Sequence, residues 1–286
     1  MDLNVKYLII TVVVIILAVG GYTVLNLDNS NTITITGSTS AYPVVEALAN
    51  AYMEKHPNVH ITVSGGDSGV GITSVRSGKV DIGTSSRNLT NAESEGLTQY
   101  VIGNDAISII VNDKNPVNTI SLTQLEGIYT GNITNWNQVG GNNSSITPVT
   151  REVGSGTRAD FENFILNNKS FESSIQVATF NYGLLQTVAV TPNSIGYIAH
   201  DYLNNQVKLL EVNDIPLTEQ TVTNGSYPLT RQLLFIVKGT PTGNIKDFID
   251  FSISPEGQSI VNNVEYNYTT SNVVYNPTSG IGPSGG

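Results

Sequence analysis

The chain has 286 residues, of which 39% are hydrophobic and only 13% charged, and its formal net charge is −10. This length suits two lobes of ordinary domain size. The composition argues against a nucleic-acid partner, because duplex binding needs stripes of Lys and Arg that the 13 basic residues do not form. Any anion that the chain binds must therefore be held by local, oriented donors.

Cysteine is absent, which excludes disulfides, thiolate metal sites and a lipid-modified N-terminal cysteine. The three histidines, His56, His60 and His200, show no spacing typical of metal ligands. We therefore expect no metal and no other cofactor.

The N-terminus carries an apolar run at 7–25, close to the roughly 20 residues that span a bilayer. Lys6 precedes this run and favours a cytoplasmic N-terminus. We expect 1–27 to form an apolar helix that anchors the chain, with the remainder on the extracytoplasmic face of the cell membrane. Cleavage after Gly20 or Gly21 is the alternative, and it would give a secreted or periplasmic protein.

Strands and helices alternate after this segment. Alternating or β-branched apolar runs predict strands at 31–37, 60–66 and 79–83, and helical spacing predicts helices at 42–56 and 70–78. Pro43 suits a first helical turn, and Ser40 is a suitable cap before it. This alternation predicts an α/β lobe with a mostly parallel sheet.

Further strands and helices are predicted in the rest of the chain. Strands are predicted at 106–112, 145–151, 194–202 and 231–239, and helices at 122–129, after 154–157, at 244–251 and at 255–262. The end of the chain, 277–286, is rich in Gly, Ser and Pro and predicts a flexible tail.

Three strand-to-helix turns combine Gly with Ser or Thr, at 37–40, 66–69 and 154–157. A helix N-terminus exposes unpaired N–H groups and the positive end of the helix dipole, so such turns can bind anions without net positive charge. Each turn alone is explained equally well by helix capping. Together they predict a common oxyanion, because Arg151 lies four residues before Ser155 and supplies a charged planar fork that suits phosphate.

Five segments resemble the phosphate-binding proteins of ABC importers, the PstS type: GSTSAYP (37–43), GGDSGVG (65–71), VDIGTSSR (80–87), IYTGNITNW (128–136) and REVGSGTR (151–158). The resemblance extends over 32–274 and includes SIGYI (194–198) and YPLTRQL (227–233). It implies a two-lobed, periplasmic-binding-protein-like (type II) α/β fold with hinge strands, and capture of inorganic phosphate between the lobes for delivery to ABC permease membrane subunits. We expect a monomer without enzymatic activity. Lobe 1 is expected at 28–111 and 228–276, and lobe 2 at 112–227.

The resemblance also implies the phosphate-binding residues, which are Thr39, Ser40, Ala41 (or the N–H of Tyr42), Ser68, Ser86, Arg151, Ser155, Gly156 and Thr157. One departure concerns Ser86, because some family members have an acid there that accepts the proton of phosphate. Asp67, where glycine is usual, or Ser86 itself could replace that acceptor, although Asp67 could equally be a helix cap. Arg87 and Arg158 could touch the anion or brace the site.

Other functions remain open from the residues alone. The same fold could bind sulfate, molybdate or tungstate, since all are tetrahedral oxyanions, or the chain could be a surface phosphate sensor without a permease. A Ser hydrolase is the weakest alternative: Ser155 lies in no G-x-S-x-G motif and no histidine is placed for a triad.

Overall fold

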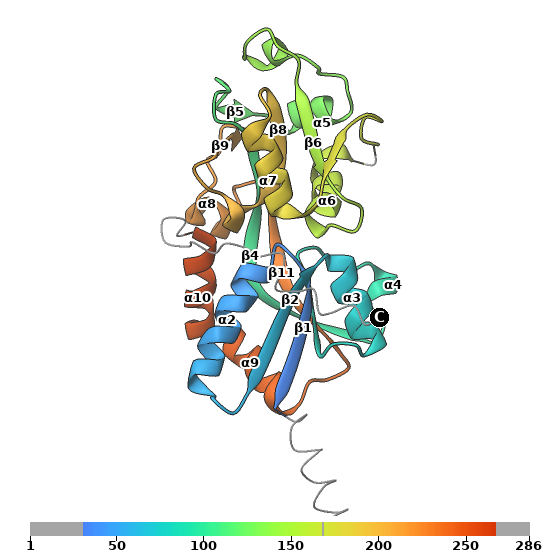
Figure 1. Cartoon of the computed structure of the whole chain (residues 1–286), viewed down its shortest axis with the longest axis vertical. Helices are drawn as coiled ribbons and strands as arrows, with labels where there is room; N and C mark the ends of the chain where they lie inside the picture. The colour runs from blue at the N-terminus through green and yellow to red at the C-terminus, as the bar shows by residue number, and fades with distance from the viewer. Residues whose placement is uncertain (1–30, 168, 267–286) are drawn as a thin grey trace, which may run out of the picture.

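The computed structural model describes residues 31–167 and 169–266, which form two α/β lobes joined by two long strands (Figure 1). The anchor predicted at 1–27 and the tail predicted at 277–286 lie outside the described residues. Within the described ranges, no helix is both long and apolar enough to cross a membrane.

Lobe 1 is built on parallel strands with connecting helices. Its elements are β1 (Thr32–Ser38), α2 (Tyr42–Lys55), β2 (His60–Gly66), α3 (Ser68–Ser77), β3 (Ile82–Ser85), α4 (Asn91–Ser94), α9 (Gly243–Ile253) and α10 (Pro255–Tyr266). Strand β1 pairs in parallel with both β2 and β3. Helices α2, α9 and α10 lie on one face of this sheet and α3 on the other (Figure 1).

The two long strands, β4 (Leu97–Asn112) and β11 (Thr230–Lys238), connect the lobes. They pair with each other in antiparallel fashion along the first half of β4, from Leu97 to Ala106. The second half of β4 pairs with lobe 2 strands instead. Only 106–112 of β4 was predicted, because the first half carries Gly103, Asn104 and Asp105 and lacks a continuous apolar run.

Lobe 2 has a second set of strands. Its elements are β5 (Thr119–Ile120), α5 (Leu122–Tyr129), η1 (Trp136–Val139), β6 (Thr147–Arg151), α6 (Gly156–Phe161), η2 (Glu162–Leu166), β7 (Gln176–Ala178), α7 (Phe180–Val190), β8 (Ser194–Ala199), η3 (His200–Tyr202), β9 (Val207–Leu209), β10 (Glu211–Val212) and α8 (Glu219–Thr223). Strand β6 is parallel to β7 and β8, whereas β4 is antiparallel to β8 and β9.

The whole sheet is therefore mixed rather than mostly parallel, with the strand order β2-β1-β3-β11-β4-β8-β6-β7. The parallel pairs lie inside each lobe, where helices return the chain to the same end of the sheet. The antiparallel pairs all involve the two connecting strands, which run through the middle of this order. The exact lobe boundaries, 111/112 and 227/228, stay a prediction.

Each lobe buries its own apolar core. In lobe 1, Tyr52, Phe235 and Phe248 pack together, with ring centroids 5.3 Å and 5.6 Å apart for the two contacts of Phe248. In lobe 2, Phe161 stacks on Tyr197 at 4.0 Å. Phe161 ends α6, so this stack fixes the helix whose N-terminus points at lobe 1.

Candidate anion-binding site

The turn between β1 and α2 packs tightly against β3. A Cβ on Gly37 (φ +145°) would lie 2.3 Å from Thr84 O, so only glycine permits this approach. The sequence predicted that Ser40 caps α2, and this is wrong: the N-cap residue is Ala41, and no side chain caps the helix. The Ser40 hydroxyl lies instead 2.8 Å from Thr157 Oγ1 of lobe 2, which satisfies this buried hydroxyl across the two lobes.

The two other lobe 1 hydroxyls predicted for the site lie beside this turn. Ser68 begins α3, and Ser86 directly follows β3. Ser38 Oγ donates to Ser86 Oγ at 3.0 Å, and Ser86 N donates to Ser68 Oγ at 3.2 Å. All three side chains are buried. Lobe 1 therefore presents a buried group of neutral hydroxyls at its junction with lobe 2.

Lobe 2 meets this group with the start of α6. A Cβ on Gly156 would lie 2.2 Å from Ser68 Oγ and 2.5 Å from Ser86 Oγ, so the backbone of Gly156 packs directly on lobe 1. Ser155 caps α6, because its Oγ accepts from Arg158 N at 3.3 Å. The predicted turns of both lobes thus meet at one place, although the Ser155 side chain is used for capping.

Arg151 ends β6 and is the buried cation of this junction, with 1% of its surface exposed. Its guanidinium donates to both carboxylate oxygens of Glu152, at 2.8 Å and 2.7 Å, and through Nη1 to Asn181 Oδ1 at 2.9 Å. Its Nη2 lies 3.7 Å from Asp67 Oδ1 of lobe 1. A fork-to-fork pair of this kind holds the guanidinium in one orientation.

Asp67 occupies the N-cap position of α3 but makes no side-chain cap hydrogen bond, so the capping interpretation of this residue fails. Burial, and then the negative charge of Glu152, raise the pKa of Asp67 to about 6, against the opposing charge of Arg151. For Glu152, burial favours a higher pKa, but the hydrogen bonds and charge of Arg151 outweigh it and lower the pKa. Asp67 is therefore the carboxyl of this junction that holds a proton most readily.

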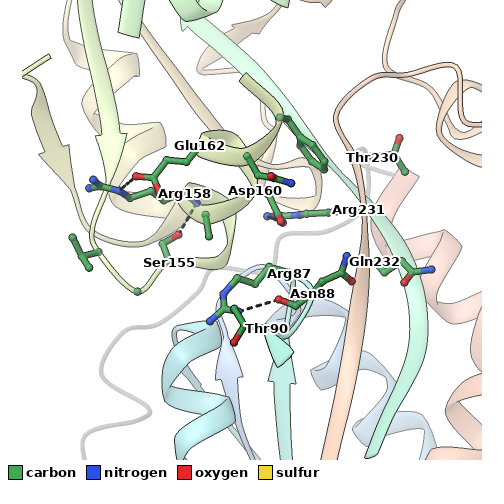
Figure 2. A pocket seen from close by; sticks show the side chains of 15 residues that line it. Arg87, Asn88, Thr90, Ser155, Arg158, Asp160, Glu162, Thr230, Arg231 and Gln232 are labelled. Atoms are coloured by element: carbon green, nitrogen blue, oxygen red, sulfur yellow. Dashed lines mark hydrogen bonds and ion pairs between the residues drawn. The ribbon is translucent and has the colours of Figure 1, made fainter. Parts of the chain in front are cut away.

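Arg87 and Arg158 are both engaged in ion pairs with glutamates. Arg87 donates to both oxygens of Glu93 at 2.8 Å, and these bonds lower the pKa of Glu93 to about 2. Arg158 donates to Glu162 at 2.8 Å and to Arg151 O at 2.9 Å. The two arginines line a cavity of about 700 Å³ between the lobes (Figure 2).

Three residues at the junction were not found from the sequence. Asn181 Nδ2 donates to Ser40 Oγ at 3.2 Å, and Tyr202 OH donates to Thr39 O at 2.7 Å, both between the lobes. Glu152 pairs with Arg151. Asn181 lies on α7 and Tyr202 on η3, neither of which has a glycine-rich turn. The only available signal was that Glu152 lies inside the REVGSGTR segment.

No cluster of three or more His, Asp or Glu side chains able to hold a metal ion occurs in 31–167 or 169–266. The donors that meet at the junction are hydroxyls, backbone N–H groups, an amide and one guanidinium. Such a set suits an anion and not a cation.

Two α/β lobes, two connecting strands and a donor-lined junction define the class of two-lobed periplasmic binding proteins. The profile described as "PBP superfamily domain" matches residues 26–256, and relatives at 30–34% identity over most of the chain are phosphate-binding proteins PstS. The chain belongs to the PstS family of this superfamily.

Three relatives illustrate the similarity. The phosphate-binding protein PstS of Bacillus subtilis is 34% identical over 83% of this chain and 80% of its own length. A Clostridium perfringens structure described as a phosphate ABC transporter substrate-binding protein with bound phosphate has 37% identity and a TM-score of 0.79, covering 82% of this chain and 98% of its own. An ABC-type phosphate transport receptor from Vibrio cholerae has 32% identity and a TM-score of 0.70, with the same coverage of both chains.

Proposed function

We propose that this protein binds inorganic phosphate between its lobes and delivers it to the membrane subunits of an ABC importer. The observation that carries the proposal is the meeting of Ser40, Ser68 and Ser86 of lobe 1 with Gly156 and Thr157 of lobe 2. The residues implied for phosphate binding in the family thus come from both lobes to one buried junction. A relative with 37% identity, whose structure contains bound phosphate, supports phosphate as the ligand.

The mechanism follows from the position of the site. An anion that contacts both lobes stabilises the closed arrangement over any open one, because only closure brings both sets of donors to it. Closure also removes water, and donors in a low-dielectric site bind the anion more strongly than in water. The net charge of −10 does not oppose this binding at short range, because the donors are local and oriented.

The proton of phosphate needs an acceptor, and we assign it to Asp67 in preference to Ser86. Ser86 Oγ already accepts from Ser38. Asp67 Oδ1 is buried and accepts no hydrogen bond from the described residues. A carboxyl with a pKa of about 6 is mostly ionised at neutral pH and can accept that proton. Sulfate carries no proton there, so it would meet an unrelieved negative charge.

The cellular setting is part of the proposal. The apolar run at 7–25 supports an anchor with both lobes on the extracytoplasmic face. We propose that the protein acts there as a monomer and not as an enzyme, because its two lobes already enclose the junction.

Isothermal titration of the full chain in mild detergent with phosphate, arsenate, sulfate and molybdate tests the proposal. We expect binding of phosphate and arsenate, and none of sulfate. Tight binding of sulfate or molybdate with no phosphate binding would instead identify another oxyanion protein. In Asp67→Asn, we expect weaker phosphate binding and a smaller preference over sulfate. Unchanged affinity and preference in that variant would transfer the acceptor role to Ser86.

A further inference from the structure

Asn181 lies in the first turn of α7 and is fully buried, with 0% of its surface exposed. Its carboxamide makes three hydrogen bonds. Oδ1 accepts from Arg151 Nη1 at 2.9 Å and from Ala199 N at 3.1 Å, and Nδ2 donates to Ser40 Oγ at 3.2 Å. One side chain therefore connects the buried cation of lobe 2 with the first turn of lobe 1.

The chemistry of the partners fixes the orientation of this amide. A guanidinium and a backbone N–H can only donate, so the amide oxygen must face Arg151 and Ala199. The NH₂ group then faces Ser40 and must donate to its oxygen. The hydroxyl hydrogen of Ser40 is consequently left for another acceptor, and Thr157 Oγ1 lies 2.8 Å away in that direction.

With Ser40 as the donor to Thr157 Oγ1, a directed chain of hydrogen bonds runs from Asn181 to Ser40 and on to Thr157. The hydrogen of Ser40 is then used by Thr157, and the hydrogen of Thr157 is the one left over. Neighbouring hydrogen bonds with the same direction strengthen one another. In this direction the Thr157 hydroxyl can donate to an anion that enters the junction.

The backbone conformation of the residue before Asn181 is unusual, which supports a functional role for this part of α7. Phe180 has φ +59°, a left-handed conformation that is unfavourable for a bulky side chain. Phe180 N lies 3.2 Å from both carboxylate oxygens of Glu152, the partner of Arg151. The start of α7 therefore holds Glu152, Arg151 and Asn181 as one unit.

We propose that Asn181 is a positioning residue of the phosphate site, which acts through Ser40 to set the Thr157 hydroxyl as a donor to the anion and orients the Arg151 guanidinium. This inference rests on the proposed function. It also assigns a role in specificity, because a Thr157 hydroxyl that offers its hydrogen at this point favours an acceptor oxygen of the ligand over a donor group.

Asn181→Asp tests the direction of these hydrogen bonds with almost no change in side-chain volume. When ionised, the new carboxylate has no hydrogen for Ser40, so Ser40 donates to the carboxylate, Thr157 donates to Ser40, and Thr157 is left with only lone pairs for the anion. It also competes with the anion for Arg151. When protonated, the new acid can donate to Ser40 again, and the original direction returns.

The experiment is a phosphate titration of the full-length variants in mild detergent at roughly pH 8 and roughly pH 5, either side of the range in which a partly buried acid titrates. The measured quantity is the ratio of each variant's dissociation constant to that of the wild type at the same pH, which cancels the titration of phosphate, Asp67 and Glu152. We expect a ratio of at least about ten for Asn181→Asp at the higher pH and a several-fold smaller ratio at the lower pH.

Two variants serve as controls. Asn115→Asp adds the same charge at another buried lobe 2 asparagine, whose Oδ1 only accepts from Val117 N, and its ratio should stay near one at both pH values. Asn181→Ala removes the amide without adding charge, and we expect a raised ratio that does not change with pH. It also keeps the test in place if the aspartate variant does not fold, which thermal melting without ligand would show.

A ratio near one for Asn181→Ala, or an Asn181→Asp ratio that does not fall at the lower pH, would overturn the role of Asn181 while leaving the phosphate site intact. Failure of the folded wild type to bind phosphate would overturn the proposed function, and the inference with it.

Discussion

The chain buries two arginines, Arg151 and Arg231, and their surroundings differ. Each donates two hydrogen bonds to one carboxylate: Arg151 to both oxygens of Glu152, and Arg231 to the single oxygen Oδ2 of Asp105, at 2.8 Å and 2.5 Å. The other partners of Arg151 are the Asn181 amide and, at 3.7 Å, the Asp67 carboxyl of lobe 1. Around Arg231 they are more carboxyls.

Arg231 and Asp105 are register partners on the connecting strands β11 and β4. Asp160 of α6 lies 3.6 Å from Arg231 Nη1, and Figure 2 shows it beside this arginine. Burial, and then the charge of Asp105, raise the pKa of Asp201 and of Glu265 well above the usual range. Arg231 thus has more carboxyls around it than it can neutralise, whereas Arg151 has only Glu152 and, more distantly, Asp67. The first arrangement suits a structural counter-ion at the hinge, the second a binding site.

The largest expected effect comes from Arg231→Met. Removing this cation leaves Asp105 buried without its partner, and breaking a buried pair costs about 3–5 kcal/mol of folding free energy. Urea unfolding without ligand should show this loss. A variant with wild-type stability would mean that the hinge carboxyls are all protonated and that Arg231 is not their counter-ion.

Arg151→Met should weaken phosphate binding more than it lowers stability. Glu152 keeps Phe180 N as a donor and its side chain is 17% exposed, against 0% for Asp105, so we expect a smaller loss of stability than in Arg231→Met. Phosphate binding should weaken by roughly a hundredfold or more, because hydrogen bonds to a charged group contribute about 1.5–3 kcal/mol each. Titration calorimetry measures this effect. If both methionine variants lost stability equally, the contrast between the two arginines would not hold.

Gly156→Ala addresses the junction itself. The added Cβ would collide with Ser68 Oγ and Ser86 Oγ, so full closure would be blocked while each lobe remains folded. We expect phosphate affinity to fall by roughly ten- to a hundredfold, equivalent to about 1.4–2.8 kcal/mol. Gly183→Ala in α7 is the matched control, because its Cβ would meet nothing closer than Thr179 Oγ1 at 3.9 Å. Equal affinity of the two variants would show that the ligand does not require this close approach.

Asp160→Asn tests whether the Asp160 carboxyl beside Arg231 makes the folding stability depend on pH. Burial raises the pKa of Asp160 from its usual 3.8 to about 7, against the opposing charge of Arg231. The folded state therefore holds this proton more tightly than the unfolded chain, so the contribution to stability is complete below about pH 4 and is lost as pH rises through about 7. The wild type should lose stability between these values by up to about 1.4 kcal/mol per pH unit more than the variant does. Urea unfolding across this range measures the difference, and Asp113→Asn, at an exposed acid, should follow the wild type. If the unfolding free energies of the wild type and Asp160→Asn changed with pH in parallel, the group that titrates would not be Asp160.

The sequence predicted the three glycine-containing turns at the junction, but it did not predict Asn181 or the first half of β4. Glycine with serine or threonine between a strand and a helix is a local signal, and all three such turns lie where the lobes meet. Asn181 and the first half of β4 lack such a signal. Asn181 acquires its role from the positive φ of Phe180 and from contacts with Ser40 and Arg151, which are distant in the chain. Contacts between lobes depend on closure, which no local pattern encodes.

The smallest expected effect is that of Arg158→Lys, which separates bracing from binding. Arg158 donates to Glu162 and to Arg151 O, and its guanidinium lies 4.7 Å from the centroid of the Phe171 ring. A lysine loses the planar fork and the stacking, so we expect a loss of about 0.5–1 kcal/mol in stability. Phosphate affinity should change by less than roughly threefold, since Arg151 keeps its own partners. An affinity loss comparable to that of Arg151→Met would place the Arg158 guanidinium on the anion, and the site would then hold two cations instead of one.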